Sequence, residues 1–68
     1  MNTTRYKVIF QNENVPDAII HAFSPYEAAI RGMAMAMLNG QDYPIKAIVD
    51  TRSGVEYWYV PGDIQEAS

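Results

Sequence analysis

The 68-residue sequence predicts a single α+β domain of order ββαββ, in which one helix packs on one face of a mostly antiparallel sheet. Three observations lead to this prediction. Two stretches near the N-terminus alternate apolar and polar residues across a short turn, a helix follows between clear capping residues, and two β-rich stretches come after it. With 49% hydrophobic residues the chain does not have a disordered composition, and its length allows one small core.

The first two strands are expected at residues 5–11 (RYKVIFQ) and 17–23 (DAIIHAF). Because side chains alternate along a strand, Tyr6, Val8 and Phe10 should share one face. The intervening NENVP contains two Asn and a Pro, which favour a turn. A connection this short predicts that the two strands form an antiparallel hairpin.

The helix is expected to begin after Ser24, a favoured N-cap. Pro25 suits the first helical position, and Glu27 completes a capping box. Asn39 and Gly40 end the helix, with the glycine supplying a left-handed residue. Advancing about 100° per residue, the stripe that should face the sheet consists of Tyr26, Ala29, Ile30, Met33, Ala36 and Met37.

The outward side of this helix has little polar surface. Met35 and Leu38 lie there, and the small residues Ala28 and Gly32 lie between the two sides. One interpretation is that Met35 and Leu38 contact another chain, because methionine suits adaptable interfaces. The alternative is that alanine and methionine are simply good helix formers and that isolated exposed apolar residues are ordinary.

The third and fourth strands are expected at residues 45–51 (IKAIVDT) and 55–60 (VEYWYV), the latter rich in aromatic and β-branched residues. The turn RSG between them can place Gly54 at positive φ, and Asp50 is expected to shape this hairpin. A Pro-Gly pair at position 61 ends the last strand, and residues 62–68 are expected to form a frayed acidic tail.

One helix covers only one face of a sheet, so the other face should be open. Apolar and aromatic side chains on it would mark an interaction site, since large exposed patches of this kind usually do. A register slip of one residue exchanges Trp58 with Tyr57 and Tyr59, so the sequence leaves open which of them the open face carries. The alternative is that the tail or a loop covers this face. The candidate partner-binding residues are Tyr57, Trp58, Tyr59, Arg52, Met35 and Leu38.

The composition argues against several other functions. Cysteine is absent and His21 is the single histidine, so we expect neither a disulfide nor a metal centre, and no cofactor. No nucleophile elbow, zinc-protease motif or Gly-rich phosphate loop occurs, which predicts that the chain is not an enzyme. With a net charge of −3 and its basic residues dispersed, direct nucleic-acid binding is not expected. No apolar run is long enough for a membrane span or an export signal, which favours a cytoplasmic location.

The hairpin followed by AFSPYEAAIRGMA and a strand ending in VDTR resembles the small phage proteins that inhibit bacterial RNA polymerase in T7-type infection. This resemblance spans about residues 6–52 and implies a helix on a sheet, with Arg52 in the place of a contact arginine. The extra strand VEYWYV departs from that family. The element order also resembles small phage anti-CRISPR proteins, and YKVIF with the EAA helix resembles HicB-type antitoxins without their DNA-binding tail.

These resemblances share one class of function. They imply a non-catalytic phage or prophage protein in the host cytoplasm, which binds a host protein machine, RNA polymerase or a CRISPR effector, and inhibits it sterically. The alternative is a homodimeric structural or accessory module without an inhibitory role. In that case Met35 and Leu38, or the last strand, would pair across a two-fold axis.

Overall fold

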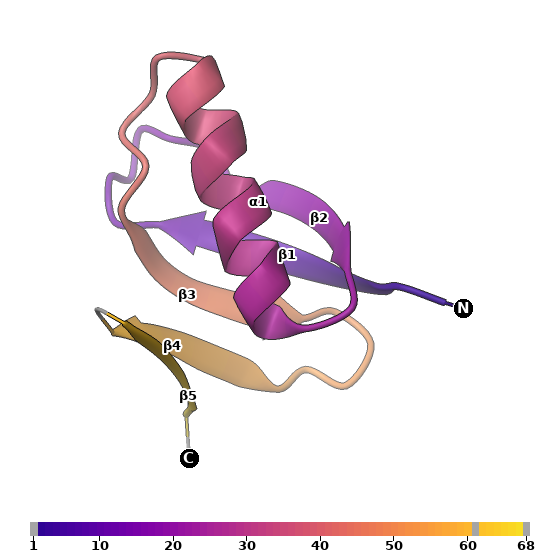
Figure 1. Cartoon of the computed structure of the whole chain (residues 1–68). Helices are drawn as coiled ribbons and strands as arrows, with labels where there is room; N and C mark the ends of the chain where they lie inside the picture. Colours follow the sequence, from indigo (N-terminus) through magenta and orange to yellow (C-terminus); the bar gives the residue numbers. More distant parts are fainter. Residues whose placement is uncertain (1, 61, 68) are drawn as a thin grey trace.

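The computed structural model describes residues 2–60 and 62–67 and consists of one helix on a five-stranded antiparallel sheet. The elements are β1 (Thr4–Phe10), β2 (Ala18–Ala22), α1 (Pro25–Leu38), β3 (Ile45–Asp50), β4 (Glu56–Val60) and β5 (Asp63–Glu66). The helix lies across one face of the sheet (Figure 1). The predicted α+β class and the helix on one face are therefore confirmed, and each expected strand is found within one or two residues of its predicted bounds.

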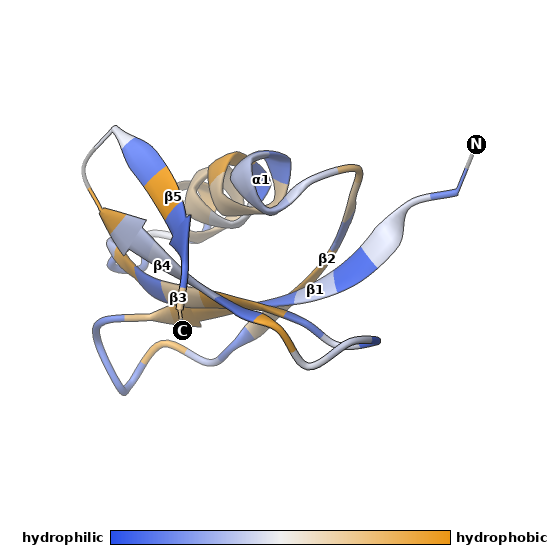
Figure 2. Ribbon diagram, turned by 90° about the horizontal axis from the view of Figure 1, so that it is seen from below, coloured by the Kyte–Doolittle hydropathy of each residue, from blue (hydrophilic) through white to orange (hydrophobic). Residues whose placement is uncertain are grey.

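The strands follow the order β2-β1-β3-β4-β5, so β1 lies in the interior of the sheet between its hairpin partner β2 and the more distant β3. All neighbouring strands run antiparallel. The helix connects β2 at one edge to β3 on the far side of β1. From there two successive hairpins extend the sheet to β5, which rises beside α1 at the other edge (Figure 2).

The expectation of a frayed tail is wrong where it concerns residues 63–66. These residues form β5, which pairs with β4 from Val60 opposite Asp63 to Tyr57 opposite Glu66. Gly62, with a φ of 84°, supplies the left-handed backbone that a tight hairpin connection needs. The expected strand end at Pro61 and the end of the tail at Ser68 lie outside the described residues.

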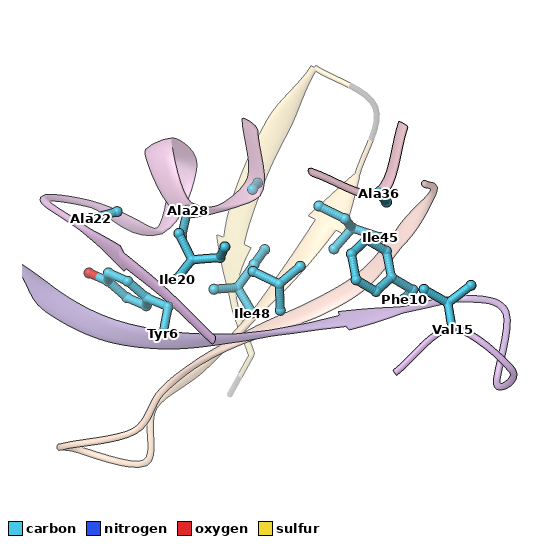
Figure 3. Close-up of a cluster of buried hydrophobic side chains, with 11 residues drawn as sticks. Tyr6, Phe10, Val15, Ile20, Ala22, Ala28, Ala36, Ile45 and Ile48 are labelled. Atoms are coloured by element: carbon cyan, nitrogen blue, oxygen red, sulfur yellow. The ribbon is translucent and has the colours of Figure 1, made fainter. Parts of the chain in front are cut away.

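The core lies between α1 and the sheet. Val8, Ile45 and Ile48 are almost completely buried, and Figure 3 shows Ile45 and Ile48 pointing toward the helix. The expected inward face of β1 is confirmed, because Tyr6, Val8 and Phe10 are all buried. Burial, with the charge of Asp50 adding to it, raises the pKa of the Tyr6 phenol above its ordinary value.

The helix approaches the sheet through small residues, which corrects part of the predicted stripe: Ala29 and Ala36 are buried and Met33 packs against the core as expected, but its other large residues are exposed. The buried helical positions are Ala28, Ala29, Gly32 and Ala36, whereas Tyr26, Ile30 and Met37 are 56%, 47% and 57% exposed. Gly32 shows the reason: a Cβ there would lie 2.9 Å from Val8 Cγ1. The small side chains let the helix axis come close to the sheet, so the helix turns its smallest rather than its most apolar face inward.

Candidate binding surfaces

The register of β4 separates the three aromatic residues that were predicted to act together. Tyr57 pairs with Ile48, whose side chain is buried under α1, and Trp58 pairs with Ala47. Because neighbouring side chains in a strand point to opposite faces, Tyr57 and Tyr59 lie on the helix side of the sheet and Trp58 lies on the other. Both tyrosines are half-buried against the core.

Among the described residues, no helix or strand forms a second layer on the sheet face opposite α1 (Figure 2). We call this face the open face. From the alternation of the strands and their register, the residues on it are Arg5, Lys7, Ile9, Ile19, His21, Ala47, Val49, Glu56, Trp58, Val60, Asp63 and Gln65. One row across the sheet runs from Ile9 through Ala47 and Trp58 to Gln65.

Trp58 is the largest side chain on the open face and is 55% exposed. Its Nε1–H donates a hydrogen bond of 3.0 Å to Glu56 Oε2, two residues away on the same face. This bond restricts the rotation of the indole, whose apolar body remains accessible. An open cleft of about 450 Å³ adjoins it, with Ile9, Lys46 and Ala47 among its lining residues.

The charges of the open face are segregated. Arg5 and Lys7 on β1 lie toward the β2 side of the sheet, whereas Glu56 lies on β4. Arg5 is held in place, because its Nε–H donates to Thr51 Oγ1 at 3.3 Å and its carbonyl accepts from the same hydroxyl at 2.9 Å. A partner that fits this face would therefore place acidic groups over β1, while near β4 the cleft beside Trp58 is lined by both Glu56 and Lys46.

Arg52 lies apart from Trp58, in the turn between β3 and β4. Asp50 Oδ1 accepts hydrogen bonds from the backbone N–H groups of Arg52 and Ser53 at 2.9 and 3.2 Å, so Asp50 does shape the hairpin as predicted. Gly54 has a φ of 79°, as expected for this turn. The Arg52 residue is exposed at the end of the sheet.

Met35 and Leu38 lie on the helix layer, away from the open face. Leu38 is 88% exposed, while Met35 borders a small cleft that Phe10 and Ala18 also line. The structure thus distributes the predicted site residues over four places: the open face, the helix side of β4, the β3–β4 turn and the outside of α1. Only Trp58 belongs to the open face.

A second cleft, which the sequence did not predict, lies where the start of α1 faces β4 and β5. It has a volume of about 480 Å³, and its lining residues are Ser24, Pro25, Tyr26, Tyr57, Asp63, Ile64 and Glu66. We call it the α1–β5 cleft. The sequence did not predict this cleft for two reasons. Residues 63–66 were expected to belong to a tail, and Tyr26 was expected to face the sheet. Two tyrosines and two carboxylates among its lining residues give it an aromatic and acidic character.

Comparisons with known proteins give no relatives on which to base a function: no family model, curated protein or solved structure matches the chain. Within residues 2–60 and 62–67, no helix is both long and apolar enough to cross a membrane. The same residues contain no group of three or more His, Asp or Glu side chains placed to hold a metal ion.

Proposed function

We propose that this chain is a non-catalytic binding protein that docks the open face of its sheet on a partner protein, with Trp58 as the anchor. The observation that carries this proposal is a half-exposed indole, fixed by Glu56, on a sheet face that no described helix or strand covers. Tryptophan is enriched among the few residues that dominate binding energy, and a restrained side chain loses less entropy on binding.

The surroundings of Trp58 fit this role. Ile9, Val49 and Val60 are only partly buried on the same face, so they can exclude water around the indole once a partner covers it. Such a surrounding of weakly contributing contacts is typical where one residue contributes most of the affinity. The separated charges of Arg5, Lys7 and Glu56 would fix the orientation of the partner more than the affinity.

The partner that we propose is a host protein machine, bacterial RNA polymerase or a CRISPR effector, which a phage- or prophage-encoded chain would block sterically. The support for this choice is the resemblance of AFSPYEAAIRGMA and its flanking strands to small phage inhibitors. The basic residues Arg5 and Lys7 on the open face would then meet acidic groups of the machine. Arg52, exposed in the β3–β4 turn, would be a peripheral contact.

The test is the affinity of the labelled chain for purified bacterial RNA polymerase and for a purified CRISPR effector. We expect Trp58→Ala to weaken binding by about 30-fold or more, as for a residue that dominates an interface, with an unchanged circular dichroism spectrum. Leu38→Ala is the matched control on the opposite layer and should change the affinity less than about twofold. If Leu38→Ala removes binding and Trp58→Ala does not, the binding site is the helix and the proposal fails; if the wild-type chain binds neither machine, the proposed partners are wrong.

A homodimeric accessory module is the second candidate function. The observation that favours it is the apolar exterior of α1, where Ile30, Met37 and Leu38 are all exposed. A second copy could cover these residues about a two-fold axis. Light scattering over a dilution series distinguishes the two functions, since only the dimer changes its mass on dilution. Leu38→Asp should then make the chain monomeric and lower its melting temperature.

A further inference from the structure

β5 ends the sheet, and its hydrogen-bonding pattern shows which of its backbone groups face outward. Ala67 N–H donates to the carbonyl of Glu56 at 2.9 Å, so these two residues form a hydrogen-bonded pair. Bonded and non-bonded pairs alternate in antiparallel sheets. The pairs Tyr57–Glu66 and Tyr59–Ile64 are therefore non-bonded, and the backbone groups of Glu66 and Ile64 point away from β4.

The outward-facing groups of β5 are only partly occupied from within the chain. The Ile64 N–H donates to the side chain of the preceding residue, Asp63 Oδ1, at 2.8 Å. This bond is consistent with an N–H that points away from β4. The carbonyl of Ile64 and both backbone groups of Glu66 face the edge, where the described residues place no further strand. This is the arrangement that accepts an added strand.

At the opposite edge, side chains from α1 hydrogen-bond to backbone groups at and just after the end of β2. On β2, Arg31 Nη1 donates to the His21 carbonyl at 3.2 Å, and Glu27 Oε1 accepts from the Phe23 N–H at 2.9 Å. Both side chains come from α1 and occupy outward-facing backbone groups at the end of β2. No helix side chain of the described residues hydrogen-bonds to the outward-facing backbone groups of β5.

The α1–β5 cleft lies directly beside this edge. Ile64 and Glu66 share the helix side of β5, because they pair with Tyr59 and Tyr57. Residues of an added strand that lie opposite them would also point to the helix side, toward the cleft. Its lining residues include Tyr26, Tyr57, Asp63 and Glu66, of which Tyr57 and Glu66 lie on the helix side by register, and none of the described residues that line it is basic.

We propose that β5 and the α1–β5 cleft bind an extended segment of a partner protein, which adds a strand to β5 and places a basic side chain in the cleft. Cations are attracted to tyrosine faces and to carboxylates, so the charge and the aromatic lining favour the same occupant. The N-terminal end of α1 carries a partial positive charge that opposes a cation. This charge is less than one unit, and the carboxylate of Glu27 in the first turn of the helix offsets it. A second copy is a poorer occupant, because pairing β5 with itself would bring Asp63 and Glu66 of both chains together.

The test is an NMR titration of the whole isotope-labelled chain with the acetylated and amidated peptide TVTRTVT, in which the Arg and both Val residues share one face. We expect the amide signals of Ile64, Gln65 and Glu66 to shift. The same peptide with citrulline in place of Arg, neutral but similar in shape, should bind about fivefold more weakly. Glu66→Gln should weaken the Arg peptide by about two- to fivefold, the range of an exposed charge pair.

Matched controls make this test decisive. Glu13→Gln removes one carboxylate from the exposed turn after β1 and should leave peptide affinity unchanged. The proposal is overturned if the β5 amides do not shift, if the Arg and citrulline peptides bind equally, or if Glu13→Gln weakens binding as much as Glu66→Gln. It is equally overturned if the β5 signals shift with protein concentration alone, because the occupant would then be a second copy.

Discussion

At the scale of single residues, Gly32 determines how closely α1 lies on the sheet. It is buried in the middle of the helix, and the nearest atoms to a Cβ built there all belong to Val8, which is itself fully buried. A Cβ at 2.9 Å from Val8 Cγ1 would be too close, so Val8 or the helix would have to shift. This contact explains why apolarity alone placed Tyr26, Ile30 and Met37 wrongly: size, rather than hydropathy, selects the inward face, and only the facing strand reveals how little space there is.

This contact predicts the effect of Gly32→Ala. In an exposed helix the change would stabilise the fold by about 1 kcal/mol, because alanine is the better helix former. Here overpacking costs about 1–3 kcal/mol, so we expect a net loss of stability, measured by urea unfolding. Ala34→Gly, at an exposed position of the same helix, calibrates the propensity effect. If Gly32→Ala proves as stabilising as that calibration implies, the close packing against Val8 is wrong.

At the scale of elements, the helix was predicted accurately because its signals are local. The features that depend on long-range strand pairing were not predicted. The helix has the predicted bounds because its signals lie within it: Ser24 Oγ accepts from the Glu27 N–H at 3.1 Å and Pro25 occupies the first turn. β5 was not predicted because DIQE is short and mostly polar, so its existence depends on pairing with β4. The register of β4 also required the structure, since alternation alone permits either face for Trp58.

The protection of the β2 edge gives a prediction at this scale. Arg31→Ala removes the donor to the His21 carbonyl and should open a short, apolar, uncharged edge to pairing with another chain. We expect more self-association on mild heating, seen by light scattering, with a loss of stability below about 1 kcal/mol, since the Arg31–Glu27 ion pair is exposed.

Lys46→Ala serves as the control for Arg31→Ala, because it removes the same charge from an exposed position on β3. Equal self-association of both variants would mean that net charge, rather than the blocked carbonyl, keeps the β2 edge unpaired.

At the scale of the whole molecule, one helix covers one face of the sheet, and no described helix or strand covers the other. The sequence allowed this layering to be predicted, because a single helix cannot cover both faces. It did not allow the site to be assembled: Tyr57 and Tyr59 pack against the core, Arg52 lies in a turn, and Met35 and Leu38 belong to the helix layer. What remains on the open face is Trp58 with its partly buried apolar neighbours.

The proposed function requires that the open face be accessible in the free chain, and the sole tryptophan of the sequence reports on this directly. The measurement is the quenching of Trp58 fluorescence by acrylamide over a wide dilution series of the purified protein. We predict efficient quenching that is the same at every protein concentration. Protection of Trp58 in the most dilute samples would mean that the chain covers its own open face, and protection that grows with concentration would mean that a second copy does; either result would contradict the account.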